Sequence, residues 1–245
     1  MLTFKEKRLL NTRNFGSYMY LGDPLNVARI FSDKKADEIF LMDIGVSAKG
    51  KHPDFDFVEK ICRWCSMPVS YAGGVSSISH IGELLSVGVE KVCLGGSIIY
   101  DQTLLGDAVL VAGSQAISTV VNVSRESGEF FVYDPISMET TKFLLCDFLE
   151  QLLMFNIGEV VINDVDLDGA KTGIDPRLAE IAARLIGVPT VLVGGVGTIQ
   201  HIADVHTRFP LMGVGVGTAF SFLNSRQSVL PRYVSDENRR LVDER

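Results

Sequence analysis

The sequence repeats itself at an interval of 121 residues, and this repeat constrains the fold more than any other feature. Residues 67–81 (MPVSYAGGVSSISHI) match residues 188–202 (VPTVLVGGVGTIQHI) at seven of fifteen positions without a gap. Further pairs at the same interval are Glu38 with Glu159, Asp43 with Asp164, and Gly96-Ser97 with Gly217-Thr218. Two unrelated strands that both end in Gly-Gly would explain one match but not the whole set. The repeat therefore predicts a chain built from two similar halves.

Each half alternates short β-branched apolar runs with amphipathic helical patterns, which is typical of βα units around a parallel sheet. The expected strands are residues 2–4, 38–43, 68–72, 91–95, 116–123, 158–163, 189–193 and 211–216. The expected helices are residues 24–35, 54–65, 78–87, 101–111, 142–155, 176–186, 199–207 and 219–225. Two equal halves of four units predict an α/β fold, namely a (β/α)8 TIM barrel with a truncated first strand.

No linker-like composition separates the two halves. We therefore expect a single barrel domain over residues 1–245, with half-barrels at about 1–112 and 113–226. Residues 124–140 are the longest insertion and predict a short hairpin loop after the fifth strand. Residues 227–245 are polar and charged and are expected to form a tail.

The composition excludes several classes of protein. The net charge of −7 and the absence of a basic block argue against a nucleic-acid surface. The apolar run at 108–113 is too short to span a bilayer, and no secretory signal opens the sequence. Cys62 and Cys65 are spaced as a CxxC motif, but they lie within one helical pattern and have no second pair. We expect a cytoplasmic protein with no membrane contact, no metal and no cofactor.

The loops that follow the strands form the working face of a TIM barrel. Glycine pairs there let backbone N–H groups approach an anion, and a nearby Ser or Thr hydroxyl completes a phosphate cradle. The repeat supplies two cradles, which predicts a ligand with a phosphate at each end, although a tight turn is the alternative for any single pair. The predicted phosphate-binding residues are Gly73, Gly74, Gly95, Gly96 and Ser97 in the first half and Asp168, Gly169, Gly194, Gly195, Gly217 and Thr218 in the second.

Carboxylates and histidines also recur at the interval of the repeat. Asp43 and Asp164 end equivalent strands and are candidates for acid/base or orienting roles. The alternative is that such carboxylates bind loop amides or cap helices. His80 and His201 lie in the helices after the glycine pairs, and their symmetric placement predicts a packing or capping role.

Six segments resemble a known family: GDPLNVARIF (22–31), ADEIFLMDI (36–44), GSQAI (113–117), SGEFFVY (127–133), DVDLDGAKTGID (164–175) and VGGVGTIQH (193–201). Together they resemble the cyclase subunit of imidazole glycerol phosphate synthase, over residues 2 to about 223. The GDPLN segment and the residue on the first strand are more similar to a subgroup encoded with surface-polysaccharide genes. Members of that subgroup work with a glutaminase in the synthesis of acetamidino sugars.

The resemblance implies a reaction and a partner. The family's cyclase forms a heterodimer with a glutaminase at the N-terminal face of the barrel and receives ammonia from it through the barrel. It uses the ammonia on a bisphosphorylated ribulose-type substrate and releases imidazole glycerol phosphate and an aminoimidazole carboxamide ribotide. A ring of charges gates the ammonia, and Glu38, Lys91 and Glu159 match three of its four members.

Two substitutions set this sequence apart from that family. The family's acid/base pair is an Asp at the end of the first strand and an Asp at the end of the fifth, where this chain has Thr3 and Asn122. Neither side chain can exchange protons as a carboxylate does, so we expect the standard cyclisation to be weak or absent. Two functions follow: a specialised paralogue in amidino-sugar synthesis, or a non-catalytic subunit that channels ammonia from a glutaminase to a separate amidotransferase.

Overall fold

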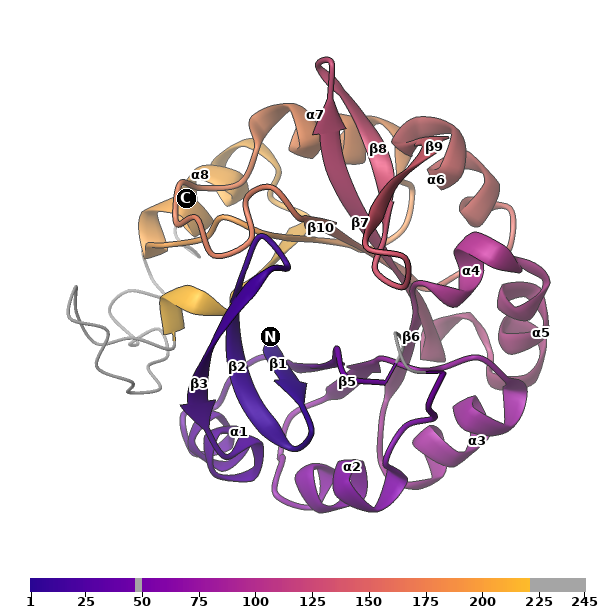
Figure 1. Cartoon of the computed structure of the whole chain (residues 1–245), viewed down its shortest axis with the longest axis vertical. Helices are drawn as coiled ribbons and strands as arrows, with labels where there is room; N and C mark the ends of the chain where they lie inside the picture. Colours follow the sequence, from indigo (N-terminus) through magenta and orange to yellow (C-terminus); the bar gives the residue numbers. More distant parts are fainter. Residues whose placement is uncertain (47–49, 221–245) are drawn as a thin grey trace.

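The computed structural model describes residues 1–46 and 50–220. These residues form a parallel barrel of strands inside a ring of helices, which confirms the predicted TIM barrel (Figure 1). The barrel strands are β1 (Leu2–Lys5), β4 (Ile39–Asp43), β5 (Val69–Ala72), β6 (Lys91–Leu94), β7 (Ile117–Glu126), β10 (Glu159–Asp164), β11 (Thr190–Val193) and β12 (Met212–Gly215). The first strand is short, with four residues, and it pairs in parallel with β4.

The helices lie close to the predicted positions. They are α1 (Pro24–Asp33), α2 (Phe55–Cys62), α3 (Ile78–Ser86), α4 (Ser97–Tyr100), α5 (Thr103–Ala112), α6 (Leu145–Leu153), α7 (Pro176–Leu185) and α8 (Ile199–Arg208), with 3-10 turns η2 (Ser114–Ala116) and η3 (Thr218–Phe220). Asp23 and Asp175 each precede a proline and accept a hydrogen bond from a first-turn amide, so α1 and α7 begin in the same way. Most of the predicted helix 219–225 and the whole predicted tail 227–245 lie outside the described residues.

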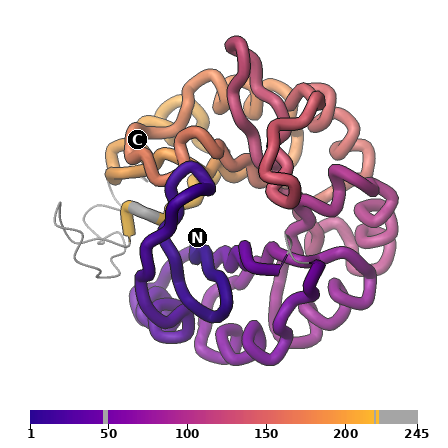
Figure 2. Tube along the Cα trace, in the orientation of Figure 1, coloured from indigo at the N-terminus to yellow at the C-terminus, as the bar shows by residue number. Residues whose placement is uncertain are grey.

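Two antiparallel hairpins interrupt the barrel pattern, one in each half (Figure 2). The hairpin of β2 (Arg8–Arg13) and β3 (Ser17–Gly22) follows β1, and the hairpin of β8 (Glu129–Asp134) and β9 (Glu139–Leu144) follows β7. The sequence predicted the second hairpin and missed the first. The predicted helix start at 142 was wrong, because β9 continues to Leu144 and α6 begins at Leu145.

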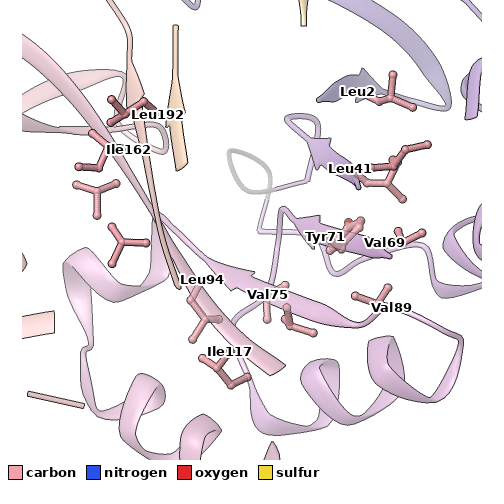
Figure 3. Close-up of a cluster of buried hydrophobic side chains, with 14 of the residues drawn as sticks. Leu2, Leu41, Val69, Tyr71, Val75, Val89, Leu94, Ile117, Ile162 and Leu192 are labelled. Atoms are coloured by element: carbon pink, nitrogen blue, oxygen red, sulfur yellow. The ribbon is translucent and has the colours of Figure 1, made fainter. Parts of the chain in front are cut away.

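Alternation of side chains along the strands divides the core into two layers. The outer layer lies between the strands and the helices (Figure 3). It includes the fully buried side chains of Leu41, Tyr71, Leu94, Ile117, Ile162 and Leu192. The inner layer fills the middle of the barrel with Met42, Ala72, Cys93, Val120, Val161 and Val193. This packing fixes the strands whose ends carry the site.

The two ends of the barrel sheet are linked by the first residue. The hydrogen-bonded strand order runs from β12 through β7 to β1 and then into the β2–β3 hairpin. The amino group of Met1 donates a hydrogen bond to the carbonyl oxygen of Val216 at 2.8 Å. The first and last barrel strands are therefore neighbours.

Candidate active site

A cavity of about 820 Å³ occupies the mouth of the barrel, where the strands end. Its walls come from the ends of six strands and from both hairpins, as the fold requires for a TIM-barrel site. Nine of the predicted site residues line it: Thr3, Asp43, Gly73, Gly74, Gly95, Gly96, Ser97, Asn122 and Asp168. The structure thus gathers the first predicted cradle and both substituted catalytic positions around one space, which we call the mouth cavity.

The strand-end aspartates adopt the same local structure in the two halves. The Asp43 carboxylate accepts a hydrogen bond from the Gly45 amide at 2.9 Å. The Asp164 carboxylate accepts from the amides of Asp166 and Leu167 at 3.0 and 3.2 Å. Burial raises the pKa of Asp43 to about 6, although the Gly45 amide acts in the opposite direction. Burial also raises the pKa of Asp164. Only Asp43 of the two lines the mouth cavity.

Thr3 and Asn122 lie at the inner wall of the barrel and are both buried. Asn122 accepts a hydrogen bond on Oδ1 from Nδ2 of Asn163, at 3.0 Å, from the neighbouring strand β10. The sequence reasoning missed Asn163. Period-two alternation along β10 places Glu159, Val161 and Asn163 on the same face, so this signal was available.

The glycine pairs are required by close backbone contacts in both halves. Gly73 and Gly74 have φ angles of +131° and +64°, and Gly194 and Gly195 have φ angles of +106° and +84°. Side chains rarely tolerate such angles. A Cβ on Gly194 would lie 2.6 Å from the Asp164 carbonyl oxygen. A tight turn therefore explains why glycine occupies these four positions, without any need for a ligand.

The Gly95-Gly96-Ser97 segment has a feature that a turn does not explain. The Ser97 hydroxyl oxygen is buried and has no hydrogen-bond partner among the described residues. Ile136 from the β8–β9 hairpin packs over Gly96, where a Cβ would come within 3.0 Å of it. A hydroxyl with an unused hydrogen-bonding capacity beside two glycines is the kind of group that binds a phosphate oxygen, but the oxygen of Ser97 is covered in this structure.

Of the second predicted cradle, Asp168 lines the mouth cavity and Gly217 lines a second cavity, described below. Gly169, Gly194 and Gly195 are not among the residues that line the mouth cavity, and the side chain of Thr218 is outside the described structure. The Gly173 amide donates to the Gly195 carbonyl at 2.8 Å, so the loop after β10 covers this glycine pair.

Asp168 anchors the tip of the β2–β3 hairpin. Its backbone oxygen accepts from the Asn14 amide at 3.1 Å, and its carboxylate accepts from the Phe15 amide at 3.4 Å. Burial raises the pKa of Asp168, while its hydrogen bonds with Thr12 and Phe15 lower it. Phe15 then meets Tyr133 of the other hairpin edge to face, with the ring centres 5.6 Å apart. The two hairpins thus join across the mouth.

The two histidines bind loop amides, as the symmetry of their positions predicted. Nδ1 of His80 accepts from the Ser76 amide at 3.4 Å, and Nδ1 of His201 accepts from the Gly197 amide at 3.2 Å. Both rings stabilise the turns that follow the glycine pairs.

The other end of the barrel carries a charged cluster that we call the gate. Nζ of Lys91 lies 2.8 Å from carboxylate oxygens of both Glu38 and Glu159. Burial alone would lower the pKa of Lys91, but its hydrogen bonds to the two carboxylates outweigh burial and raise it. Ser70 also donates to Glu38, at 2.5 Å. The structure thus brings together all three residues of the predicted gate.

A second cavity, of about 740 Å³, begins at the gate and is lined by Glu38 and Glu159. Met1 and Cys93 line both this cavity and the mouth cavity, so these two residues lie between the two spaces. The Cys93 thiol accepts a hydrogen bond from the Ser118 hydroxyl at 2.7 Å, and burial raises its pKa to about 12. Burial lowers the pKa of the Met1 amino group to about 6. The other side chains of the inner layer, such as Val120 and Val161, are apolar.

Comparison with known proteins places this architecture in a family. The model of the family described as "Histidine biosynthesis protein" matches residues 5–225. The chain belongs to this family. A relative from Vibrio vulnificus, named "Putative imidazole glycerol phosphate synthase subunit hisF3", is 32% identical over 98% of this chain and 93% of its own length. A relative from Leptospira borgpetersenii with the corresponding HisF name is 29% identical over 95% and 92%. The "Imidazole glycerol phosphate synthase subunit HisF" of an Exiguobacterium species is 27% identical over 83% and 80%.

This member of the histidine biosynthesis family exposes apolar side chains around the gate end. They come from the last turn of α5 and from the segments after α2, α6 and α8, which lead into the starts of the barrel strands. The residues are Trp64, Leu110, Val111, Met154 and Leu211, with Leu110 85% and Leu211 96% exposed.

The described part of the chain carries neither a membrane-spanning helix nor a cluster of metal ligands. No helix within residues 1–46 and 50–220 has the length and hydropathy needed to cross a membrane. The same residues contain no group of three His, Cys, Asp or Glu side chains placed to hold a metal ion.

Proposed function

We propose that this protein is an ammonia-handling, cyclase-like subunit that works in the cytoplasm with a glutaminase. Ammonia enters at the gate, passes the neutral interior of the barrel and reaches a phosphorylated small molecule in the mouth cavity. The single observation that carries this proposal is that a cavity at the gate and the mouth cavity share Met1 and Cys93 as lining residues. The relatives' name, imidazole glycerol phosphate synthase subunit, supports the same assignment.

The glutaminase docks on the gate end of the barrel. The exposed apolar side chains there offer buried contact area, and Glu90 and Lys91 offer charges that a partner can match. Co-purification with the glutaminase encoded nearby tests this. Reversal of both charges, Glu90→Lys with Lys91→Glu, is expected to abolish the complex. The matched control is Glu129→Lys, an exposed residue on the β8–β9 hairpin, which should leave the complex intact. Failure of the unmodified chain to associate, or indifference to the double reversal, contradicts the docking proposal.

The phosphate of the substrate binds at Gly95, Gly96 and Ser97, and a second phosphate binds near Gly217. The free Ser97 hydroxyl supports the first site. Calorimetry with a sugar bisphosphate tests both: Ser97→Ala and Gly217→Leu are each expected to weaken binding about tenfold or more. Unchanged affinity in Ser97→Ala refutes the first site, and unchanged affinity in Gly217→Leu refutes the second.

The standard ring closure to imidazole glycerol phosphate is weak or absent in this protein. Neither Thr3 nor Asn122 has a side chain that ionises near neutral pH, and each missing acid/base group costs roughly 10²–10⁴ in rate. The test is product formation from the bisphosphorylated substrate and an ammonium salt, followed by chromatography. We expect no product from the unmodified chain and little from Asn122→Asp alone. A turnover similar to that of a standard cyclase in the unmodified chain overturns this part of the proposal.

The role we favour is therefore a specialised one, in amidino-sugar synthesis. A second candidate is a subunit that only passes ammonia to a separate amidotransferase, and the absence of titratable side chains at both strand-end positions supports it. Expression of this protein in a histidine auxotroph tests standard histidine synthesis. Growth without histidine would indicate the standard reaction, and we expect no growth under either of the two candidate roles. Glutamine-dependent amidination with the glutaminase, with and without the amidotransferase, then separates the two candidates.

A further inference from the structure

We propose that the turn at residues 135–138, between β8 and β9, is a lid over Ser97, and that Tyr100 latches this lid closed by its hydrogen bond to Asp134. Tyr100 and Asp134 are then positioning residues, because they act on ligand binding through the turn. The proposal rests on the proposed function only for the identity of the ligand, a phosphate at Ser97. The movement of the turn itself is independent of that assignment.

The turn fills the space beside the glycines of this wall. Pro135, Ile136 and Met138 line the mouth cavity together with Gly96 and Ser97. A Cβ added to Gly96 would lie 3.0 Å from both Cδ1 and Cγ1 of Ile136, and 3.4 Å from Cγ of Pro135. The room that a phosphate would need against the backbone of Gly96 is therefore taken by the turn. A phosphate binds there only if the turn moves away.

The hydroxyl of Ser97 makes the closed position costly. Ser97 follows Gly96 directly, and its oxygen is buried without a hydrogen-bond partner among the described residues. Native proteins pair such groups with a protein group, water or a ligand, because an unpaired buried hydroxyl costs free energy. Opening of the turn would let water or a ligand reach this oxygen. The closed position therefore needs an attachment that offsets this cost.

Asp134 provides this attachment through hydrogen bonds in two directions. Its carboxylate accepts from the amides of Ile136 and Ser137, at 2.9 and 3.3 Å, which fixes the shape of the turn. The same carboxylate accepts from the hydroxyl of Tyr100, the last residue of α4, and α4 begins at Ser97. Asp134 is 3% exposed, so water competes little for its charge. Tyr100 thus ties the turn to the wall that the turn covers.

Thiol labelling at residue 97 measures the opening without any ligand. The full chain with Ser97→Cys is treated with iodoacetamide, and tandem mass spectrometry distinguishes a label at residue 97 from one at Cys93. When opening and closing are faster than labelling, the labelling rate is proportional to the open population. We expect residue 97 to react about tenfold or more slowly than in the urea-unfolded chain. Adding Tyr100→Phe is expected to raise its rate about tenfold, because one hydrogen bond to a charged group is lost.

Two controls show whether the effect belongs to the latch. Tyr133→Phe is the matched variant on the same hairpin, since its hydroxyl contacts the weakly accepting sulfur of Met138 at 3.9 Å, and it should leave the rate at residue 97 unchanged. Labelling of Cys93, which is 1% exposed, reports unfolding of the barrel and should not change with Tyr100→Phe.

Three results would overturn the lid. The first is a rate at residue 97 that already equals the rate in the unfolded chain. The second is a rate that Tyr100→Phe leaves unchanged. The third is an increase with Tyr100→Phe that Tyr133→Phe or Cys93 reproduces, because this would show a general loosening of the structure.

Calorimetry with a sugar bisphosphate separates the lid from the phosphate site. If a phosphate binds at Ser97 only when the turn is open, the apparent affinity is proportional to the open population. Tyr100→Phe should then tighten binding by the same factor by which it accelerates labelling. Faster labelling with unchanged affinity, or with no binding at all, refutes the phosphate site at Ser97 and supports the lid. Unchanged labelling refutes the lid, whatever the affinity for the bisphosphate.

Discussion

Replacing Asp43 with asparagine is expected to stabilise the protein at neutral pH and to have little effect in acid. The carboxyl is 7% exposed, and burial raises its pKa from 3.8 to about 6. Between these two values the unfolded chain releases the proton before the folded chain does. Stability contributed by this group is therefore full below about pH 4 and is lost as the pH rises to about 6.

The size of the effect follows from the two pKa values. Each pKa unit corresponds to about 1.4 kcal/mol, so ionised Asp43 costs the folded state about 3 kcal/mol above pH 6. Asparagine stays neutral, and its Oδ1 can still accept from the Gly45 amide. Asp43→Asn should therefore raise the free energy of unfolding by up to about 3 kcal/mol at about pH 8. The gain should shrink toward zero at about pH 4.

Urea unfolding of the two chains across this pH range is the assay. Asp107→Asn, at an exposed position on α5, is the control and should give no pH-dependent difference. A gain for Asp43→Asn that does not vary with pH would show that something other than its ionisation is responsible. A loss of stability at about pH 8 would show that the folded protein uses the charged carboxylate, and would refute the reasoning. The same titration matters for function, because a mouth carboxyl with a pKa of about 6 can exchange a proton near neutral pH.

Three further changes test other parts of the structure. Gly195→Ala should destabilise the fold by about 3 kcal/mol or more, as measured by thermal unfolding. The reason is that the φ angle is +84° and the new Cβ would collide with the carbonyl oxygen of Gly173. Lys91→Met should lower the free energy of unfolding by about 2 kcal/mol near neutral pH, as measured by urea unfolding. The substitution leaves the partly buried carboxylates of Glu38 and Glu159 without the cation between them. Phe15→Ala should change the free energy of unfolding by less than about 1 kcal/mol. It should increase amide hydrogen exchange at the tips of both hairpins, because it removes the contact with Tyr133. Unchanged exchange at the tips would contradict the claim that this contact joins the hairpins.

The candidate site was predicted from the sequence only where it depends on strand ends. The repeat and the strand pattern located Asp43, Ser97 and Asn122, since parallel strands in a barrel end on one face. The gate was predicted from the resemblance to the cyclase family, in which Glu38, Lys91 and Glu159 match three members of a ring of charges. The second glycine set was expected at the same mouth, and its glycines are not among the residues that line the mouth cavity. Loop paths decide this, and short-range patterns do not encode them.

The sequence by itself determined the order and bounds of most strands and helices, because β-branched runs, caps such as Asp23 and Asp175, and apolar periodicity act over a few residues. Only the tertiary structure decided which side chains face one another inside the barrel. Asn122 and Asn163 are 41 residues apart and meet because the register between β7 and β10 aligns them. The pKa of Asp43 and the burial of the Asn122–Asn163 pair likewise depend on several distant strands. Desolvation is a property of the whole packed barrel, so no local segment of the sequence contains it.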